Sequence, residues 1–145
     1  MSEEGLQFGI QRVYIKDVSF ESPQGVLLFN KQISPAIEQD IAMSVTTVAE
    51  DHYEVVLTLT ITAKEGEQVL FLVEVHQAGI FGIRGANEEQ LRKITSTQCP
   101  TILFPYARQL IDSLLQHASL APLLLPPINF DALSFQPKPE DTVTH

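Results

Sequence analysis

The chain of 145 residues has little cysteine and few basic side chains. Its single cysteine, Cys99, excludes an intramolecular disulfide and fits a reducing compartment. Nine Lys and Arg residues against 18 Asp and Glu residues give a formal net charge of −9. This charge argues against a nucleic-acid partner, because a phosphate backbone needs Lys and Arg to replace its counterions. An acidic chain instead fits repulsion between like neighbours, or a basic partner.

The sequence also lacks the apolar segments that direct a chain to a membrane. Its first residues, MSEEGLQFG, contain no apolar stretch of the kind found in signal peptides. No apolar run reaches the length needed to cross a bilayer. We therefore expect a cytoplasmic protein without direct membrane insertion.

Residue patterns typical of enzymes and metal sites are missing as well. The histidines show no metal-ligand spacing; they are His52, His76, His117 and His145. Cys99 matches no local cysteine motif, so a buried, inert thiol is the favoured interpretation. The segment GIFGIRG (79–85) lacks the Lys-Ser/Thr ending of a phosphate-binding loop. We therefore predict no enzyme activity, no metal and no cofactor.

The first half of the chain shows the pattern of β-strands. In LQFGIQRVYIKDVSFE (6–21) apolar positions alternate, but their phase slips before Val13 and again before Val18. Such slips predict β-bulges, or a strand that is partly covered on both faces. Asp17 and Glu21 share one face of this strand, so their carboxylates project together.

Three further strands follow a long connection. Residues 22–40 show little periodicity and are expected to form a crossing loop. IAMSVTTVA (41–49) and YEVVLTLTITA (53–63) predict a hairpin, because apolar and polar residues alternate in the second of them. A turn at Gly66 leads to a fourth strand over 68–77.

The glycines after this fourth strand permit two interpretations. A bend there would expose Ile80, Phe81 and Ile83 as the lining of an apolar groove. The same three side chains could equally close the core. On the strand itself, Glu74 and His76 point the same way, and two polar residues on a wetted face are favoured over an oriented imidazole.

The second half of the chain predicts helices. Asn87 and Gln90 match a capping box, and Pro100 or Pro105 suits the first turn of the next helix. An apolar stripe then recurs at helical spacing, through Leu103, Tyr106, Ala107, Leu110, Ile111, Leu114 and Leu115. Because this stripe is wide for one helix on one sheet, we expect a second contact, for example with another subunit.

The stretch PLLLPPINFDALSF (122–135) is too apolar for a solvated tail. Its prolines predict a stiff connection that leads away from the long helix. NFDAL (129–133) then predicts a short helix that Asn129 caps, with Phe130 and Leu133 facing inward. A cap at Asp131 is the alternative.

Five blocks of the sequence together resemble one family. They are RVYIKDVSFESP (12–23), YEVVLTLTITA (53–63), FLVEVHQAGIFGI (71–83), CPTILFPYAR (99–108) and PPINFDAL (126–133). In this order they are similar to the SecB family of protein-export chaperones. The resemblance implies an α+β fold with a four-stranded antiparallel sheet, a long crossover loop after the first strand, one long helix and a short C-terminal helix. A single domain would cover 1–135, and 136–145 would be a disordered polar tail.

The resemblance implies binding rather than catalysis. SecB-like chaperones hold unfolded precursor proteins in apolar grooves, keep them export-competent and deliver them to the translocation ATPase SecA. An unselective binder of unfolded chains gains roughly 25 cal/mol for each Å² of apolar area removed from water. Such a binder needs no nucleotide.

The resemblance also implies three sets of residues. The SecA-binding surface would consist of Asp17, Glu21, Leu72 and Glu74, and it would face a basic tail whose zinc belongs to the partner. The client groove would include Ile37, Ile41, Ile80, Phe81 and Leu133. The interface of a homotetramer, assembled as a dimer of dimers, would include Val73, Val75, Gln77, Leu103, Tyr106, Leu110 and Leu114.

The chain departs from the family pattern in the expected client groove. Gln39 stands where an apolar groove residue is expected, and Ser134 stands where Phe usually follows NFDAL. Two alternative functions are a SecB-like chaperone dedicated to a single client, such as an antitoxin, and a small-molecule-binding protein. The acidic residues assigned to SecA binding favour general export over a dedicated chaperone.

Overall fold

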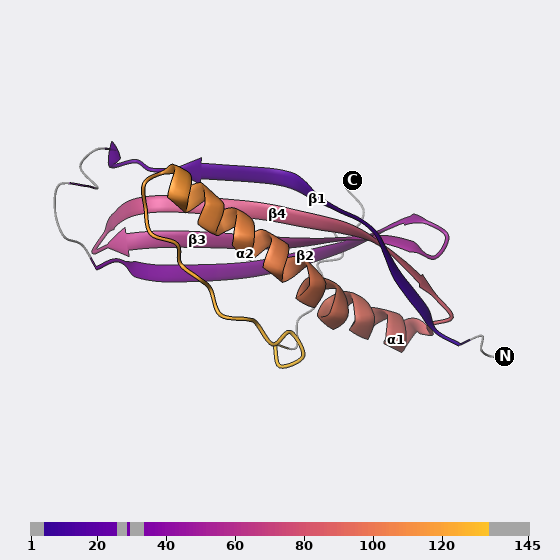
Figure 1. Cartoon of the computed structure of the whole chain (residues 1–145). Coiled ribbons are helices and arrows are strands. Elements are labelled where there is room, and N and C mark those ends of the chain that lie inside the picture. Colours follow the sequence, from indigo (N-terminus) through magenta and orange to yellow (C-terminus); the bar gives the residue numbers. More distant parts are fainter. Residues whose placement is uncertain (1–4, 26–28, 30–33, 134–145) are drawn as a thin grey trace.

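The protein consists of one antiparallel sheet with a long helix across one of its faces (Figure 1). The computed structural model describes residues 5–25, 29 and 34–133. The strands lie in the order β1-β4-β3-β2, with β1 Gln7–Glu21, β2 Ala36–Ala49, β3 His52–Glu65 and β4 Gln68–Arg84. The helical elements are α1 Glu88–Lys93, the π-helical segment η2 Ile94–Gln98 and α2 Cys99–His117. The α+β fold predicted from the sequence is confirmed.

Strand β1 is irregular at the two places where its apolar phase slips. Its pairing with β4 shifts between Ile10 and Arg12, and again between Ile15 and Asp17. Each bulge inserts a residue and so turns the side chains that follow to the opposite face. The predicted bulges are confirmed, and the second one brings Asp17 to the face opposite the helix.

Two strands are longer than the sequence suggested. The loop expected over 22–40 ends earlier, because β2 begins at Ala36 and its first residues pair with the end of β3. The loop was predicted from weak periodicity, but Glu38 and Asp40 lie on one face of an edge strand whose other face is more apolar. The predicted end of the fourth strand at residue 77 is also wrong, since β4 continues to Arg84.

Close packing against the helix explains a glycine in the extension of β4. A Cβ added to Gly79 would lie 2.8 Å from Phe81 Cε1 and 3.0 Å from Leu103 Cδ2. The glycine therefore lets α2 approach the strand. Phe81 and Ile83 are buried in the core, whereas Ile80 lies half-exposed on the other side of the strand. The core interpretation is thus correct for two of these three apolar residues.

The core lies between the sheet and α2. On β3, alternate residues from Val55 to Ile61 have no exposed surface, and the same holds for Val73 and Val75 on β4. Four residues of α2, spaced four apart, complete the core: Leu103, Ala107, Ile111 and Leu115. We call this side of the sheet the covered face and the opposite side the open face.

The helical elements form one continuous rod. It begins at the predicted capping box, in which the Gln90 amide donates to the Asn87 side chain at 2.8 Å. Pro100 lies in the first turn of α2, as predicted, and Pro105 lies inside that helix. None of the helices in the described part of the chain is both long and apolar enough to cross a membrane.

The segment after α2 runs back along the helix. The Asp112 carboxylate accepts a hydrogen bond from the Leu123 amide at 2.9 Å. Further on, Phe130 packs edge-on against Phe104, with ring centroids 6.4 Å apart. The prolines of this stretch therefore connect the long helix to a segment that covers one of its sides.

Residues 130–133 form turns instead of the predicted short helix. The Asn129 side chain accepts a hydrogen bond from the Asp131 amide at 3.1 Å, a contact two residues ahead that stabilises a turn rather than a helix cap. The predicted inward position is confirmed for Phe130, which is 1% exposed, but not for Leu133, which is 45% exposed. Ser134 and the predicted tail over 136–145 lie outside the described residues.

Candidate functional site

The four residues that the family resemblance assigned to SecA binding lie together on the open face. The strand register pairs Glu21 with Leu72, and pairs Ser19, two residues away on β1, with Glu74. Asp17 is two residues further along the same strand. Because directly paired residues of neighbouring strands share a face, these side chains form one surface. We call Asp17, Glu21, Leu72 and Glu74 the acidic surface.

A hydrogen-bonded chain holds Glu74 in place. His76 Nε2 lies 2.6 Å from Glu74 Oε2 and donates to it, while Thr58 Oγ1 lies 3.2 Å from His76 Nδ1. Thr60 Oγ1 donates to the other carboxylate oxygen at 3.3 Å. The favoured interpretation, two polar residues on a wetted face rather than an oriented imidazole, is correct in part: both residues do lie on the open face, but Glu74 also orients the imidazole. On the neighbouring strand, Thr58 positions the imidazole, and the imidazole and Thr60 each bind one oxygen of the Glu74 carboxylate.

A second carboxylate on the open face is buried, and each of its two oxygens accepts a hydrogen bond. Glu54 is 9% exposed, and its two oxygens accept hydrogen bonds from the Tyr14 hydroxyl and from Lys16 Nζ, the latter at 3.1 Å. Burial, together with the hydrogen bond and charge of Glu54, raises the pKa of Tyr14. Lys16 neutralises Glu54, so this carboxylate adds no net charge to the neighbouring acidic surface.

Glu54 and Lys16 border a polar hollow of about 280 Å³ that extends to Asp17 of the acidic surface. Its lining includes Lys16, Asp17, Thr58 and His76. This contact between β1 and β3 was not predictable from the sequence, because the two strands flank β4 and their register comes from the fold. Only the position of Glu54 among the threonines on the polar side of its strand placed it on this face.

The structure does not gather the predicted client-groove residues in one place. Ile37 and Ile41 lie on the covered face of the edge strand β2. Ile80 and Phe81 are neighbours in a strand and thus point to opposite faces. Phe81 has no exposed surface and stacks on Phe8, with ring centroids 5.8 Å apart. Exposed apolar area at these positions therefore comes mainly from Ile37 and Leu133, with smaller shares from Ile41 and Ile80.

The predicted interface residues divide into two groups. Tyr106 is 52% exposed, and Leu110 and Leu114 are half-buried on the same flank of α2. The other four predicted residues are buried within one chain: Val73, Val75, Gln77 and Leu103. A second subunit cannot touch the three apolar members of this group directly, because they have no exposed surface.

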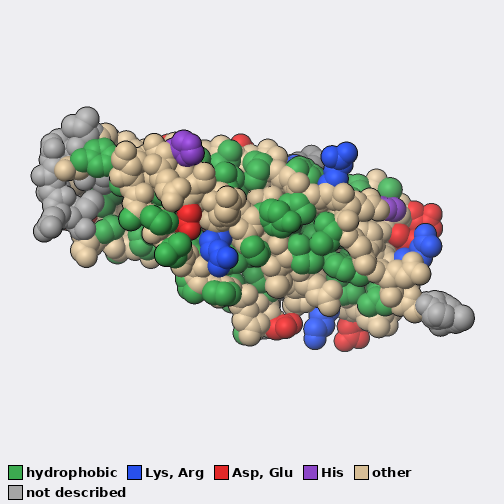
Figure 2. Space-filling model, viewed as in Figure 1, with side chains coloured by type: hydrophobic (Ala, Val, Ile, Leu, Met, Phe, Trp, Pro, Cys, Tyr) green, Lys and Arg blue, Asp and Glu red, His purple; other side chains and the backbone are tan. Residues whose placement is uncertain are grey.

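The edge strand β1 also carries exposed apolar side chains. Ile10, Ile15 and Val18 pair with residues of the covered face of β4 and are 48%, 41% and 40% exposed. Figure 2 looks onto the side that bears α2 and shows hydrophobic side chains distributed over it. Apolar area of this kind at a sheet edge is typical of a contact surface.

Cys99 is a free cysteine, and it lies in no cluster of potential metal ligands within the described residues. The cysteine is buried, as predicted, and burial raises the pKa of its thiol. Among the described residues, no group of three or more His, Cys, Asp or Glu side chains could hold a metal ion.

Comparison with known proteins gives the same family as the sequence blocks. The family model described as "Preprotein translocase subunit SecB" matches residues 1–140. A protein named "Protein-export protein SecB" from Cellvibrio japonicus is 51% identical over 132 residues, which cover 91% of this chain and 79% of that protein. Its namesake from Saccharophagus degradans is 53% identical over 130 residues, 89% of this chain and 77% of the relative.

A solved structure shares the fold at low sequence identity. It is a SecB-like chaperone of Mycobacterium tuberculosis in complex with a peptide from the HigA1 antitoxin. The match has a TM-score of 0.67 and 15% identity, and it covers 88% of this chain and 91% of the other. The fold follows from this likeness, and the family follows from the sequence matches: the chain belongs to the SecB family of protein-export chaperones.

Proposed function

We propose that this chain holds non-native precursor proteins on exposed apolar surface, keeps them export-competent and delivers them to SecA in the cytoplasm. It acts as a homotetramer and uses no cofactor. The residues for delivery are those of the acidic surface. The residues for holding include Ile37, Ile41, Ile80 and Leu133, with Phe81 as a support beneath the surface.

The acidic surface is the observation that carries the delivery step. Two strands place Asp17, Glu21 and Glu74 around Leu72 on an uncovered face of the sheet. A basic peptide would gain charge complementarity at this surface, which raises its rate of association and its specificity. Leu72 adds a small apolar contact at the centre.

Exposed apolar area supports the holding step and the assembly. A non-native chain exposes side chains that a folded protein buries, and each Å² removed from water contributes roughly 25 cal/mol. Tyr106 and the apolar residues of β1 offer a second such area on the covered side, where two copies of the chain could meet. In this proposal, clients and subunits use different apolar surfaces.

Replacement of Glu74 by Lys tests the delivery step. The charge reversal should weaken binding of the SecA C-terminal tail by about 30-fold or more, ~2 kcal/mol, in isothermal titration calorimetry. Glu50→Lys makes the same change in an exposed turn at the far end of the sheet and should retain most of the affinity. Equal affinity of the Glu74→Lys variant and the parent chain would rule out this surface as the SecA site.

A refolding assay tests the holding step. At stoichiometric amounts the chain should delay refolding of a denatured, slow-folding precursor and suppress its light scattering. The small-molecule alternative predicts no effect in this assay. A dedicated chaperone predicts an effect on one client and none on unrelated precursors, so a panel of precursors separates it from general export.

A further inference from the structure

Two glycines on the open face are not required by the fold. Gly9 on β1 and Gly82 on β4 are directly paired, and neither has a positive φ. A Cβ at Gly9 would meet nothing within 4 Å, and at Gly82 the nearest atom would be Gln11 Nε2 at 3.5 Å. Glycine weakens a strand and often marks a place where a ligand or another backbone approaches closely. Packing explains Gly79, but it does not explain this pair.

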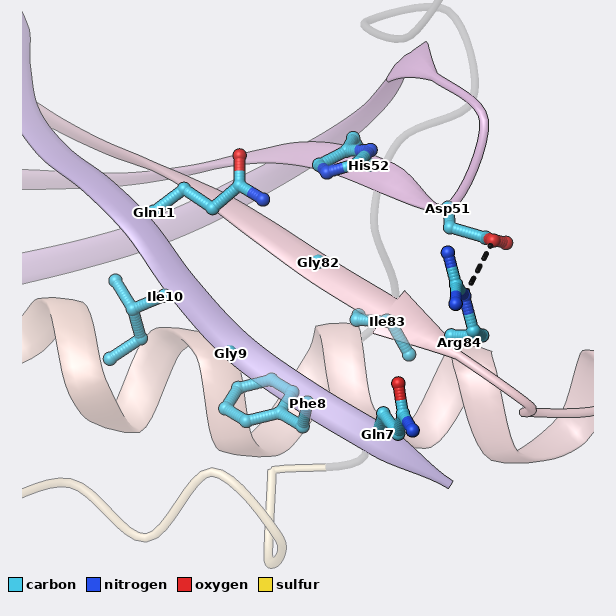
Figure 3. Close-up of a pocket in the computed structure, with 10 residues that line it drawn as sticks. All are labelled: Gln7, Phe8, Gly9, Ile10, Gln11, Asp51, His52, Gly82, Ile83 and Arg84. Atoms are coloured by element: carbon cyan, nitrogen blue, oxygen red, sulfur yellow. Dashed lines mark hydrogen bonds and ion pairs between the residues drawn. The ribbon is translucent and has the colours of Figure 1, made fainter. Parts of the chain in front are cut away.

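The pair lies at the base of a hollow of about 360 Å³ (Figure 3). Figure 3 shows Gln11 and His52 on one side of β4 around Gly82, with the Asp51–Arg84 ion pair beyond them. Gln11 belongs to the first bulge of β1, and bulges commonly redirect side chains beside functional sites. We call this feature the glycine hollow.

The hollow offers a hydrogen-bond donor and an acceptor above the same glycine. His52 Nδ1 lies 2.7 Å from the Glu50 carbonyl oxygen, which can only accept, so Nδ1 carries the proton. In the neutral ring, Nε2 is therefore an acceptor. Nε2 lies 3.8 Å from the position of a Gly82 Cβ, and the Gln11 amide nitrogen, a donor, lies 3.5 Å from it.

These features match the main chain of an extended polypeptide. Each peptide group offers one N–H and one C=O, and a floor without side chains lets it come close. Ile80 lies on the same face two residues before Gly82, about 7 Å along the strand, which is also the spacing of alternate side chains in an extended segment. If an apolar side chain of an extended client packs against Ile80, the client's main chain about two residues further on would lie over the hollow.

Resting on the proposed holding function, we infer that the glycine hollow binds the main chain of an extended, non-native segment. Every unfolded polypeptide has this backbone, so recognition here is independent of client sequence. The apolar contact at Ile80 contributes affinity, and the hollow favours client segments whose main chain is extended. Most peptide groups of a folded protein are already hydrogen-bonded, so a non-native chain offers more of them to the hollow.

Filling the hollow gives a test in which stability and binding change in opposite directions. In the Gly9→Ala/Gly82→Ala variant both methyl groups have room, so Tm should stay the same or rise. Affinity for an unfolded, leucine-rich peptide should fall roughly tenfold in fluorescence anisotropy, while SecA-tail binding should not change. Ser44→Ala, elsewhere on the open face, is the control and should bind the peptide like the parent chain.

Backbone methylation distinguishes the main chain from a side chain as the occupant. N-methylation of the central amides of the same peptide should weaken binding to the parent chain roughly tenfold and should add little to the loss in the glycine variant. Additive losses, or equal affinity of the glycine variant and the parent chain, would overturn the assignment. A parent chain that binds no peptide would instead refute the holding function itself, so the two failures are distinguishable.

Discussion

The two faces of the sheet differ in the environment of their side chains: alternate residues of the same strands are buried on one face and hydrogen-bonded on the other. On the covered face, residues of β3 and β4 such as Leu59 and Val75 are fully buried under α2. On the open face, the residues between them form hydrogen-bonded groups, including Thr60 with Glu74 and Thr58 with His76. The fold therefore depends mainly on one face, which leaves the other free to carry charge and small residues.

This division explains how acidic residues and glycines are tolerated inside long strands. A carboxylate such as Glu74 needs no desolvation on an uncovered face, and threonine hydroxyls already hold it. The contrast between the faces can be tested by substitutions on each of them.

Matched leucine replacements should separate the faces most strongly. Leu59→Ala would leave a cavity in the covered face and should lower the free energy of unfolding by about 2–5 kcal/mol. Leu72→Ala, on the half-exposed open face, should cost roughly 1 kcal/mol. Urea denaturation at equal protein concentration measures both. Similar losses would show that the open face is as important for folding as the covered face.

A charge on the exposed flank of α2 should disrupt assembly without unfolding the chain. Tyr106→Asp would place an unpaired carboxylate in the proposed subunit contact and should raise the dissociation constant by about 30-fold, ~2 kcal/mol. Native mass spectrometry should then show fewer tetramers at low concentration. Gln68→Glu, an exposed change of equal charge at the start of β4, should leave the distribution unchanged. Intact tetramers in both variants would place the interface elsewhere.

The sequence predicted the covered face better than the element ends. Strict alternation over 53–63 and the phase slips before Val13 and Val18 are local signals, so the central strands and both bulges were predictable. The start of β2 was missed because residues 22–40 show little periodicity, and the end of β4 was missed because Gly79 suggests a break when neighbours in space are unknown. Pairing with β3 stabilises the first of these segments, and packing under α2 stabilises the second.

Only part of the candidate site could be predicted from the sequence. Asp17 and Glu21 could be placed on one face from spacing alone, and the family pattern added Leu72 and Glu74. The contacts that hold them depend on cross-strand register, which pairs Thr58 with His76 and Thr60 with Glu74. Register of this kind follows from the whole sheet rather than from any one strand.

His76 should affect SecA binding through the position of Glu74. His76→Leu removes the donor to Glu74 and should weaken tail binding about fivefold, ~1 kcal/mol, in the calorimetric assay. His76→Gln keeps a donor and should restore most of the affinity. His117→Gln, at the end of α2, serves as the control for loss of a histidine. A leucine variant that binds like the parent chain would show that Glu74 acts without this support.

The smallest expected effect concerns the Tyr14–Glu54 contact, and it depends on pH. Tyr14→Phe should cost roughly 1 kcal/mol at neutral pH, because a buried carboxylate loses one donor. The pKa of Tyr14 is raised in the folded state above its ordinary value near 10. The stabilisation is therefore complete below about pH 10 and is lost as pH rises through the folded-state pKa.

The free-energy difference between the parent chain and Tyr14→Phe should accordingly shrink as pH rises above about 10. Effects of high pH on other groups, including Lys16, are common to both proteins and largely cancel in the difference. Urea denaturation at several pH values measures the difference, with Tyr53→Phe on the covered face as the control. A difference that stays constant with pH would mean that Tyr14 ionises equally easily in the folded and unfolded chains, whereas the absence of any difference would mean that Glu54 is held by Lys16 alone.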